Sequence, residues 1–269
     1  MISFTFILSL TVAGLVAGLL AGLFGVGGGI VLVPIMYFLF LAFEVPAGVA
    51  LDVATATSLA CIIPTSLSSI LSHHRRDNID WSLVVRWCLP MITGVAAGAS
   101  VIIYLPGNQL TILFAAIAIF AAFCMLYKPE KSLADTLPNN RTQALIATSI
   151  GAISTMVGIG GGSLSVPTLS AYNYETRRAI GTAASFGLVI SLPSVIALMG
   201  VVSPPPGAPA GSFGLVNIYA WLAIVPFSVT MAPLGAHLAS KLDPLLLKRL
   251  FAVMLAVTSI RMALQGLGL

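Results

Sequence analysis

Apolar residues dominate the chain in long runs, and short polar stretches divide these runs into ten segments. A run of about 20 apolar residues predicts a membrane-spanning helix. The segments are residues 4–24, 30–43, 51–72, 81–104, 109–127, 143–158, 163–174, 178–200, 215–239 and 248–267. We therefore expect an all-α polytopic membrane protein with about ten transmembrane segments, the first of which is a helix rather than a cleaved signal peptide.

The second and seventh segments are shorter than the others, with 14 and 12 residues. An α-helix rises about 1.5 Å per residue, so each would cover only about 20 Å of a hydrocarbon layer about 30 Å thick. Each short segment follows three consecutive glycines, which disfavour a continuous helix. We expect short or broken helices here, and the sequence leaves open whether they are full spans or re-entrant hairpins.

The two glycine-rich stretches are copies of one another. GVGGGIVLVP at 25–34 and GIGGGSLSVP at 158–167 match at six of ten positions, at an offset of 133 residues. Small residues precede both copies at four-residue spacing, which lets helices approach closely in lipid. These residues are Gly14, Gly18 and Gly22 in the first copy and Ala147, Gly151 and Thr155 in the second. After the copies, TATSL at 55–59 resembles TAASF at 182–186.

This repetition divides the chain into two halves. Residues 1–127 and 143–269 each contain five segments, and a polar linker at 128–142 lies between them. Because five is odd, the second half enters the membrane from the opposite side. Inverted repeats of this kind are typical of secondary transporters, whose halves open a central site to one side and then to the other.

Charge is scarce and gathers mainly in and beside the connections. The chain is 58% hydrophobic and 7% charged, with a mean hydropathy of +1.06 and a formal net charge of +4. Lys and Arg occur in the four connections that join segments 3–4, 5–6, 7–8 and 9–10, and in none of the connections 2–3, 4–5 and 8–9. The positive-inside rule then places the linker in the cytoplasm and both termini outside. The chain has no basic run with interleaved aromatic residues, which is the pattern that would indicate nucleic-acid binding.

The glycine breaks indicate a ligand site. Irregular backbone is tolerated within a membrane where it is buried in protein or lines a cavity. Pro34 and Pro167 follow the breaks at a place that suits the first turn of a helix, and the free N–H groups of such a turn attract anions. A tight crossing of packed helices is the alternative explanation of the glycines.

Hydroxyl groups near the breaks extend the candidate site, although such groups also bond the preceding helical turn. The candidate substrate-binding residues are Gly27, Gly28, Gly29, Thr55, Thr57, Ser58, Gly160, Gly161, Gly162, Ser163, Thr182, Ser185 and Arg261. Arg261 would either neutralise an anion or extend to the membrane surface. Glu44 and Asp52 flank an outer connection, where we expect them to be solvated or to cap a helix.

Other chemistry is disfavoured. Ser163 and His237 are the only candidates for the nucleophile and the base of a serine hydrolase, and no residue near His237 in the sequence would orient it. The glycines do not match the dinucleotide-binding pattern. Cys61, Cys88 and Cys124 lack metal-ligand spacing and are typical of packing residues. We expect no enzyme activity, no cofactor and no metal.

The doubled glycine motif, the TATSL and TAASF stretches and the ten-segment layout together resemble the sulfite exporter TauE/SafE family. The resemblance covers nearly the whole chain and implies a transporter of small sulfur-containing anions such as sulfite, sulfonates or sulfoacetate, in the inner membrane of a prokaryotic cell. An anion channel, or a carrier of another small organic anion, is the alternative. The direction of transport, the oligomeric state and coupling to H⁺ or Na⁺ stay open.

Overall fold

The computed structural model describes residues 4–24, 29–105, 107–126, 134, 136–200, 203–239 and 244–267. Within these residues the chain forms ten α-helices and one short hairpin. The helices are α1 (Phe4–Phe24), α2 (Gly29–Ala42), α3 (Ala47–His74), α4 (Trp81–Tyr104), α5 (Gly107–Leu126), α6 (Asn140–Val157), α7 (Gly162–Ala171), α8 (Thr176–Gly200), α9 (Ile218–Ala239) and α10 (Pro244–Gly266). The predicted all-α fold is confirmed, and the predicted segments differ from these helices by a few residues at their ends.

One feature of the sequence pattern has a clear structural counterpart, and one structural element was not predicted. The helices that follow the glycine motifs, α2 and α7, are short, with 14 and 10 residues. The strands β1 (Ser212–Phe213) and β2 (Val216–Asn217), which were not predicted, form an antiparallel hairpin in the connection between α8 and α9.

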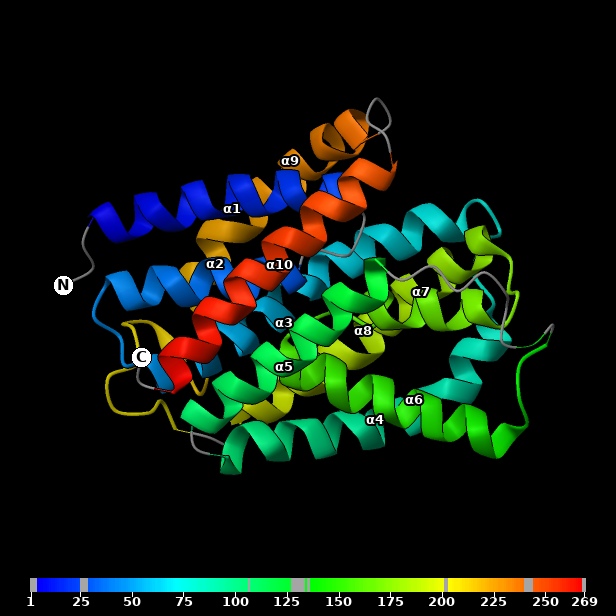
Figure 1. Cartoon of the computed structure of the whole chain (residues 1–269), viewed down its shortest axis with the longest axis horizontal. Helices are drawn as coiled ribbons and strands as arrows, with labels where there is room; N and C mark the ends of the chain where they lie inside the picture. Colours follow the sequence, from blue (N-terminus) through cyan, green and yellow to red (C-terminus); the bar gives the residue numbers. More distant parts are fainter. Residues whose placement is uncertain are drawn as a thin grey trace.

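The helices pack mainly on partners that lie far away in the sequence. Helix α3 lies against α8 at the centre of the bundle, α1 packs along α9, α4 along α6, and α5 along α10 (Figure 1). Helices α1 and α9 lie on one side of the bundle and α4 and α6 on the other (Figure 1). The first helix of each five-helix set thus lies beside the fourth helix of the other set.

Small residues allow these close pairings. A Cβ atom on Gly18 of α1 would lie 2.5 Å from the Cα of Ser228 on α9. A Cβ atom on Gly151 of α6 would clash with the Met91 carbonyl oxygen of α4. Such distances are shorter than van der Waals contact, so the small residues that precede the glycine motifs make the close helix approach expected of them.

Two similar hydrogen bonds tie the helix pairs together. Asp80 stands at the start of α4, and its backbone N–H donates to Thr182 Oγ1 of α8 over 3.0 Å. Asn217 stands at the start of α9, and its backbone N–H donates to Thr57 Oγ1 of α3, also over 3.0 Å. Each residue also caps its own helix with its side chain, because Asp80 accepts from the Leu83 N–H and Asn217 from the Ala220 N–H.

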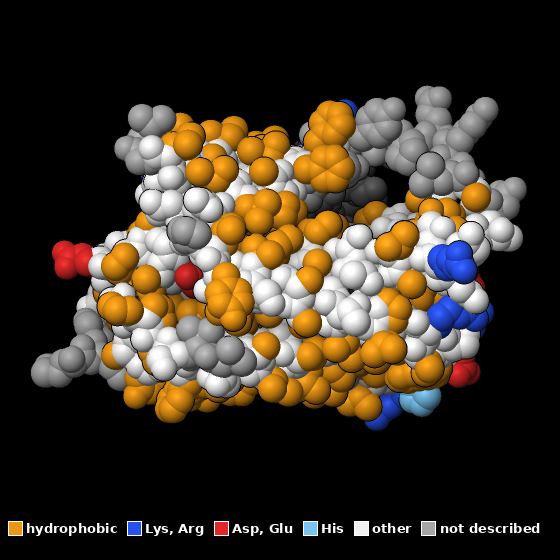
Figure 2. Space-filling model, turned by 90° about the horizontal axis from the view of Figure 1, so that it is seen from below, with side chains coloured by type: hydrophobic (Ala, Val, Ile, Leu, Met, Phe, Trp, Pro, Cys, Tyr) orange, Lys and Arg blue, Asp and Glu red, His pale blue; other side chains and the backbone are white. Residues whose placement is uncertain are grey.

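The exterior has the polarity of a membrane protein. Apolar side chains cover much of the face shown in Figure 2, where Lys and Arg gather mainly at one end. Both termini lie at the opposite end (Figure 1). Of the described helices, α3, α4, α8 and the Ile218–Gly235 part of α9 are long and apolar enough to cross a membrane. The chain is therefore a polytopic membrane protein.

The Asp80 junction gives stability a pH dependence. Partial burial tends to raise the pKa of the Asp80 carboxyl, but hydrogen bonds from Tyr174, the Leu83 N–H and Ser82, with the nearby charge of Arg178, outweigh it and lower the pKa. A carboxyl whose pKa is lowered by folding stabilises the protein above the pKa of the unfolded chain, about 3.9 for Asp. That contribution is lost as the pH falls through the lower folded value.

We expect Asp80→Ala to destabilise the purified protein by about 0.5–2 kcal/mol at neutral pH, which is the usual cost of losing a helix N-cap. The deficit relative to wild type should shrink as the pH falls through the folded pKa. Thermal unfolding in detergent across a pH series measures both effects. Asp77→Asn removes a charge from the same connection and should leave stability unchanged; an equal loss in this control would contradict the capping role.

Candidate functional site

The two glycine motifs meet inside the bundle. A Cβ atom on Gly29, the first residue of α2, would lie 2.7 Å from the Gly158 carbonyl oxygen. Gly158 ends α6 with a left-handed φ of 67°, and a Cβ atom there would lie 2.8 Å from Val33 Cγ2. The structure therefore brings Gly29 together with the second motif. Gly27 and Gly28 lie outside the described residues.

Ser58 connects the two motifs to α3. Its side chain is fully buried, and its Oγ donates to the Gly158 carbonyl oxygen over 2.8 Å and lies 3.4 Å from the Gly29 carbonyl oxygen. A buried hydroxyl shared by two backbone breaks holds them in a fixed relation, because losing it would leave buried carbonyl groups unpaired. Ser58 therefore has a structural role in the site, because its hydroxyl holds the two motifs against α3.

The second motif places the start of α7 beside open space, and the Ser163 N–H of its first turn reaches the Gly160 carbonyl oxygen over 3.4 Å. Gly161 occupies the N-cap position of α7 and offers no side-chain cap. No described atom lies within 4 Å of a Cβ atom built on Gly162, the first residue of α7. The first N–H groups of a helix have no intrahelical partner and carry partial positive charge. The start of α7 can therefore interact with an anion without a cationic side chain.

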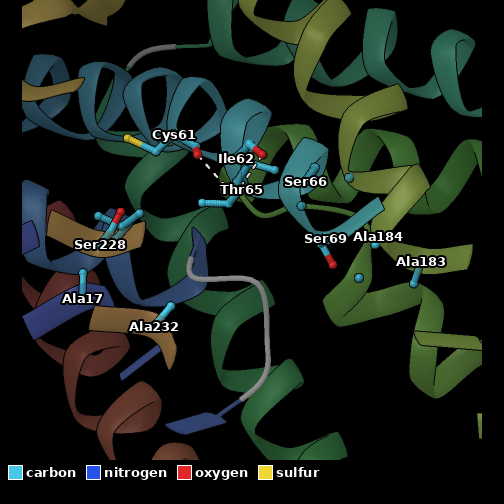
Figure 3. A pocket seen from close by; sticks show the side chains of 14 residues that line it. Ala17, Cys61, Ile62, Thr65, Ser66, Ser69, Ala183, Ala184, Ser228 and Ala232 are labelled. Carbon is cyan, nitrogen blue, oxygen red and sulfur yellow. Dashed lines mark hydrogen bonds between the residues drawn. The ribbon is translucent and has the colours of Figure 1, made fainter. Parts of the chain in front are cut away.

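That open space is a cavity of about 200 Å³. It lies between the second glycine motif and helices α1, α2, α3, α8 and α9, so residues from both ends of the sequence form its wall. In Figure 3, Cys61, Thr65, Ser66 and Ser69 approach it from α3, Ala183 and Ala184 from α8, and Ser228 and Ala232 from α9. Gly160 and Gly162 also line it.

The cavity wall is apolar with a few hydroxyl groups. Its polar side chains are Thr65, Ser66, Ser69 and Ser228, and none of its described lining residues is Asp, Glu, Lys, Arg or His. Thr65 already bonds the Cys61 and Ile62 carbonyls of its own helix (Figure 3). Ser66 and Ser69 make no such bond in the described structure, so their hydroxyls are available to a ligand.

Ser66 and Ser69 were not among the predicted site residues, although the spacing of hydroxyl residues along α3 indicates them. Hydroxyl residues recur on α3 at Thr55, Ser58, Ser66 and Ser69, with spacings that place them along one face of a helix. The predicted set ended at Ser58 on this helix, because its members were chosen from the repeat, and the repeat does not extend to Ser66. The periodicity of α3 alone would have extended the candidate site.

Other predicted residues lie away from the cavity wall. Thr57 and Thr182 accept the two hydrogen bonds that tie the helix pairs, and Thr55 and Ser185 are buried with no partner for their hydroxyls. Ser163 is partly buried in the first turn of α7. The structure does not bring any of these four hydroxyls, or Ser163, into the cavity wall.

Arg261 is also remote from the cavity. It is exposed on α10, and its guanidinium carbon lies 5.5 Å from the centre of the Phe38 ring on α2. A cation over an aromatic face is a modest favourable interaction at an exposed site. Of the two roles considered for Arg261, this position favours the one in which the side chain extends along the outside of the bundle.

Comparison with known proteins gives the site a family context. The family described as Sulfite exporter TauE/SafE matches residues 10–262. A probable membrane transporter protein of Haemophilus influenzae is 33% identical over 264 residues, covering 97% of this chain and 100% of that protein. A probable membrane transporter protein of Methanocaldococcus jannaschii is 28% identical and covers 95% of this chain and 94% of its own. No solved structure matches.

Proposed function

We propose that this chain, which belongs to the sulfite exporter TauE/SafE family of membrane transporters, carries a small sulfur-containing anion through the cavity beside the second glycine motif. Sulfite, sulfonates and sulfoacetate-like anions are the candidate substrates, and an inner membrane of a prokaryotic cell is the proposed location. The family is one of transporters and not of enzymes, so the cavity is a place where a solute is bound and released.

The observation that carries this proposal is the uncapped start of α7 at the cavity wall. Partial positive charge at the start of α7 would balance the anion, and the Ser66 and Ser69 hydroxyls would donate to its oxygens. Gly160 and Gly162 would let the anion approach the backbone closely, because they have no side chains. Binding by N–H and O–H donors alone keeps the affinity moderate, which suits a site that must release its ligand.

The helix pairing supports transport by alternating access between two inverted halves, residues 1–127 and 143–269. The first helix of each five-helix set packs on the fourth helix of the other set, as expected for two halves related by a pseudo-two-fold axis. The lining residues of α3, Cys61 to Ser69, belong to the half of this helix that approaches the basic end. With that end in the cytoplasm, we propose that this cavity belongs to a cytoplasm-facing state.

A flux measurement tests the proposal. We expect liposomes containing the purified protein to take up labelled sulfite or a labelled small sulfonate, with saturation and with acceleration by unlabelled substrate on the opposite side. The same anions should raise the thermal stability of the protein, by about 2.7 kcal/mol at a concentration 100 times the Kd. Chloride at equal ionic strength is the control for unspecific salt effects.

The outcomes separate the proposal from its alternatives. Flux that does not saturate and shows no counter-exchange would indicate an anion channel. Exchange of carboxylates without any effect of sulfur oxyanions would indicate a carrier of another organic anion. Absence of both flux and stabilisation with every sulfur oxyanion would overturn the substrate assignment.

A further inference from the structure

Helix α3 holds the only carboxylate found inside any of the ten described helices. Asp52 lies in the second turn of α3, at the end of the bundle where the termini lie. The side chain is partly accessible, but its Oδ1 atom is buried and has no hydrogen-bond partner. It caps nothing, because the N-cap position of α3 belongs to Pro46. The expectation that Asp52 could cap a helix is therefore wrong, and its side chain is only partly solvated.

A second unpaired oxygen lies one turn further along α3. Thr55 is fully buried, and its Oγ1 has no hydrogen-bond partner. Threonines within the described helices commonly bond a carbonyl of the preceding turn, as Thr65 and Thr155 do. Asp52 is the one carboxylate among the residues with a buried, unpaired side-chain atom in the described structure, and the unpaired Thr55 oxygen stands at i+3 of the same helix, so we take this pair as the candidate binding place.

The charged and titratable groups of the neighbouring elements leave this carboxylate unpaired. On its end of the bundle these groups are Tyr37 of α2, Glu44 before α3, Tyr219 of α9 and Arg261 of α10. None of these described groups is bonded to the Asp52 carboxylate or forms an ion pair with it. An ionised carboxylate with a buried, unbonded oxygen is costly, and binding of a cation removes that cost.

The geometry favours a proton over a metal cation. A metal ion needs several oxygen or nitrogen ligands, and the described residues hold no group of three His, Cys, Asp or Glu side chains. A proton needs only the carboxylate itself. It can reach the partly accessible Asp52 side chain from the aqueous phase at the end where the termini lie.

Asp52 is also connected to the second glycine motif through the contacts that the next two turns of α3 make with it. The Cα and carbonyl oxygen of Thr55 lie 3.0 Å from the position of a Cβ atom on Gly158, and Ser58, one turn further, donates to the Gly158 carbonyl. Three consecutive turns of α3 thus join the carboxylate to the backbone break that ends at the cavity. A change of charge at Asp52 can therefore bias how α3 sits against the second motif.

We propose that Asp52 binds and releases the proton that couples solute movement to the pH gradient. This proposal rests on the transport function proposed above. In the proposed cycle a proton from water at the end where the termini lie adds to the Asp52 carboxylate. After the protein has changed conformation, the carboxylate releases this proton to water again. No bond of the transported anion changes.

Transport by Asp52→Asn liposomes tests the coupling. We expect this variant to lose net flux driven by an imposed pH gradient, down to the level of protein-free liposomes. It should keep exchange of labelled sulfonate for unlabelled sulfonate at equal pH, because exchange needs no proton release. Glu44→Gln, which neutralises an exposed carboxylate at the same end, should retain both activities. Gradient-driven flux that survives in Asp52→Asn would overturn the proposal.

A measurement without substrate separates this proposal from the transport function. In an infrared pH titration of purified protein, a carbonyl band of a protonated carboxylic acid should persist at about pH 6, above the ordinary carboxyl pKa values of about 4. This band should be present in wild type and in Glu44→Gln and lost in Asp52→Asn. An unchanged band in Asp52→Asn overturns the proton site even if sulfonate is transported. If wild-type liposomes move no sulfur oxyanion, the proposed function fails, and this band still decides whether Asp52 binds a proton.

Discussion

Gly162→Leu is expected to abolish transport and to leave the protein folded. Gly162 lines the cavity as the first residue of α7, and no described atom lies within 4 Å of a Cβ atom built there. A leucine side chain therefore starts in open space and extends into the cavity, where it covers the helix start at which the anion is proposed to bind. Labelled sulfonate flux should fall to the background of protein-free liposomes, and the stabilising effect of the anion should disappear.

The matched control for this substitution is Gly200→Leu. Gly200 is the last residue of α8, a Cβ atom on it also meets no described atom within 4 Å, and it does not line the cavity. This variant should transport at the wild-type rate, and both leucine variants should unfold at wild-type temperature. Wild-type flux in Gly162→Leu would remove this cavity from the transport path.

Gly158→Ala should instead damage the fold itself. Its backbone has a left-handed φ of 67°, and a Cβ atom would lie 2.8 Å from Val33 Cγ2 and 3.0 Å from the backbone of Thr55. Left-handed backbone costs a non-glycine residue roughly 1–2 kcal/mol, and overpacking adds about 1–3 kcal/mol. We expect a loss of about 2–5 kcal/mol in unfolding free energy, seen as a lower unfolding temperature and a poor yield of purified protein.

Two further variants locate the cause of that loss. Gly158→Asn tolerates the left-handed backbone better than Ala but brings the same Cβ contacts, so it should remain clearly destabilised. Gly162→Ala adds a Cβ in open space at the start of a helix and should keep wild-type stability. Equal stability of Gly158→Ala and Gly162→Ala would show that the two motifs do not press against each other at Gly158.

The sequence predicted the helices well because hydrophobic runs and polar connections are local signals. Segment 81–104 and helix α4 have the same bounds, and the glycine motif at 158–167 predicted both the end of α6 and the short helix α7. The hairpin between α8 and α9 was missed, since its strands have only two residues each and lie in a stretch rich in Pro and Gly. A strand of that length has no detectable periodicity.

The candidate site was predicted less completely because its parts are set by packing. Gly29, Gly160 and Gly162 were found through the repeat, and the structure brings them close to the cavity or into its wall. Thr57 and Thr182 were chosen for the same reason, but each bonds a residue at the start of a distant helix, more than 100 residues away in sequence. No local pattern distinguishes a hydroxyl that accepts such a bond from one that faces a ligand.

Asp52 illustrates the opposite error. Its position near the end of an apolar segment made solvation the natural expectation for a charged residue. The predicted segment 51–72 has Asp52 as its second residue, whereas α3 begins at Ala47. The earlier start places Asp52 in the second turn of the helix, where one of its carboxylate oxygens is buried.

The reciprocal bonds from Asp80 to Thr182 and from Asn217 to Thr57 bear on how the protein is made. Helix α1 leaves the ribosome about 200 residues before its main partner α9, and Thr57 leaves it 160 residues before Asn217. The helices inserted early must therefore stay in the bilayer without their final neighbours until synthesis is nearly finished. Assembly of the bundle is consequently a late event in biogenesis, and a chain cut short before α9 leaves α1 without its main partner and Thr57 of α3 without Asn217.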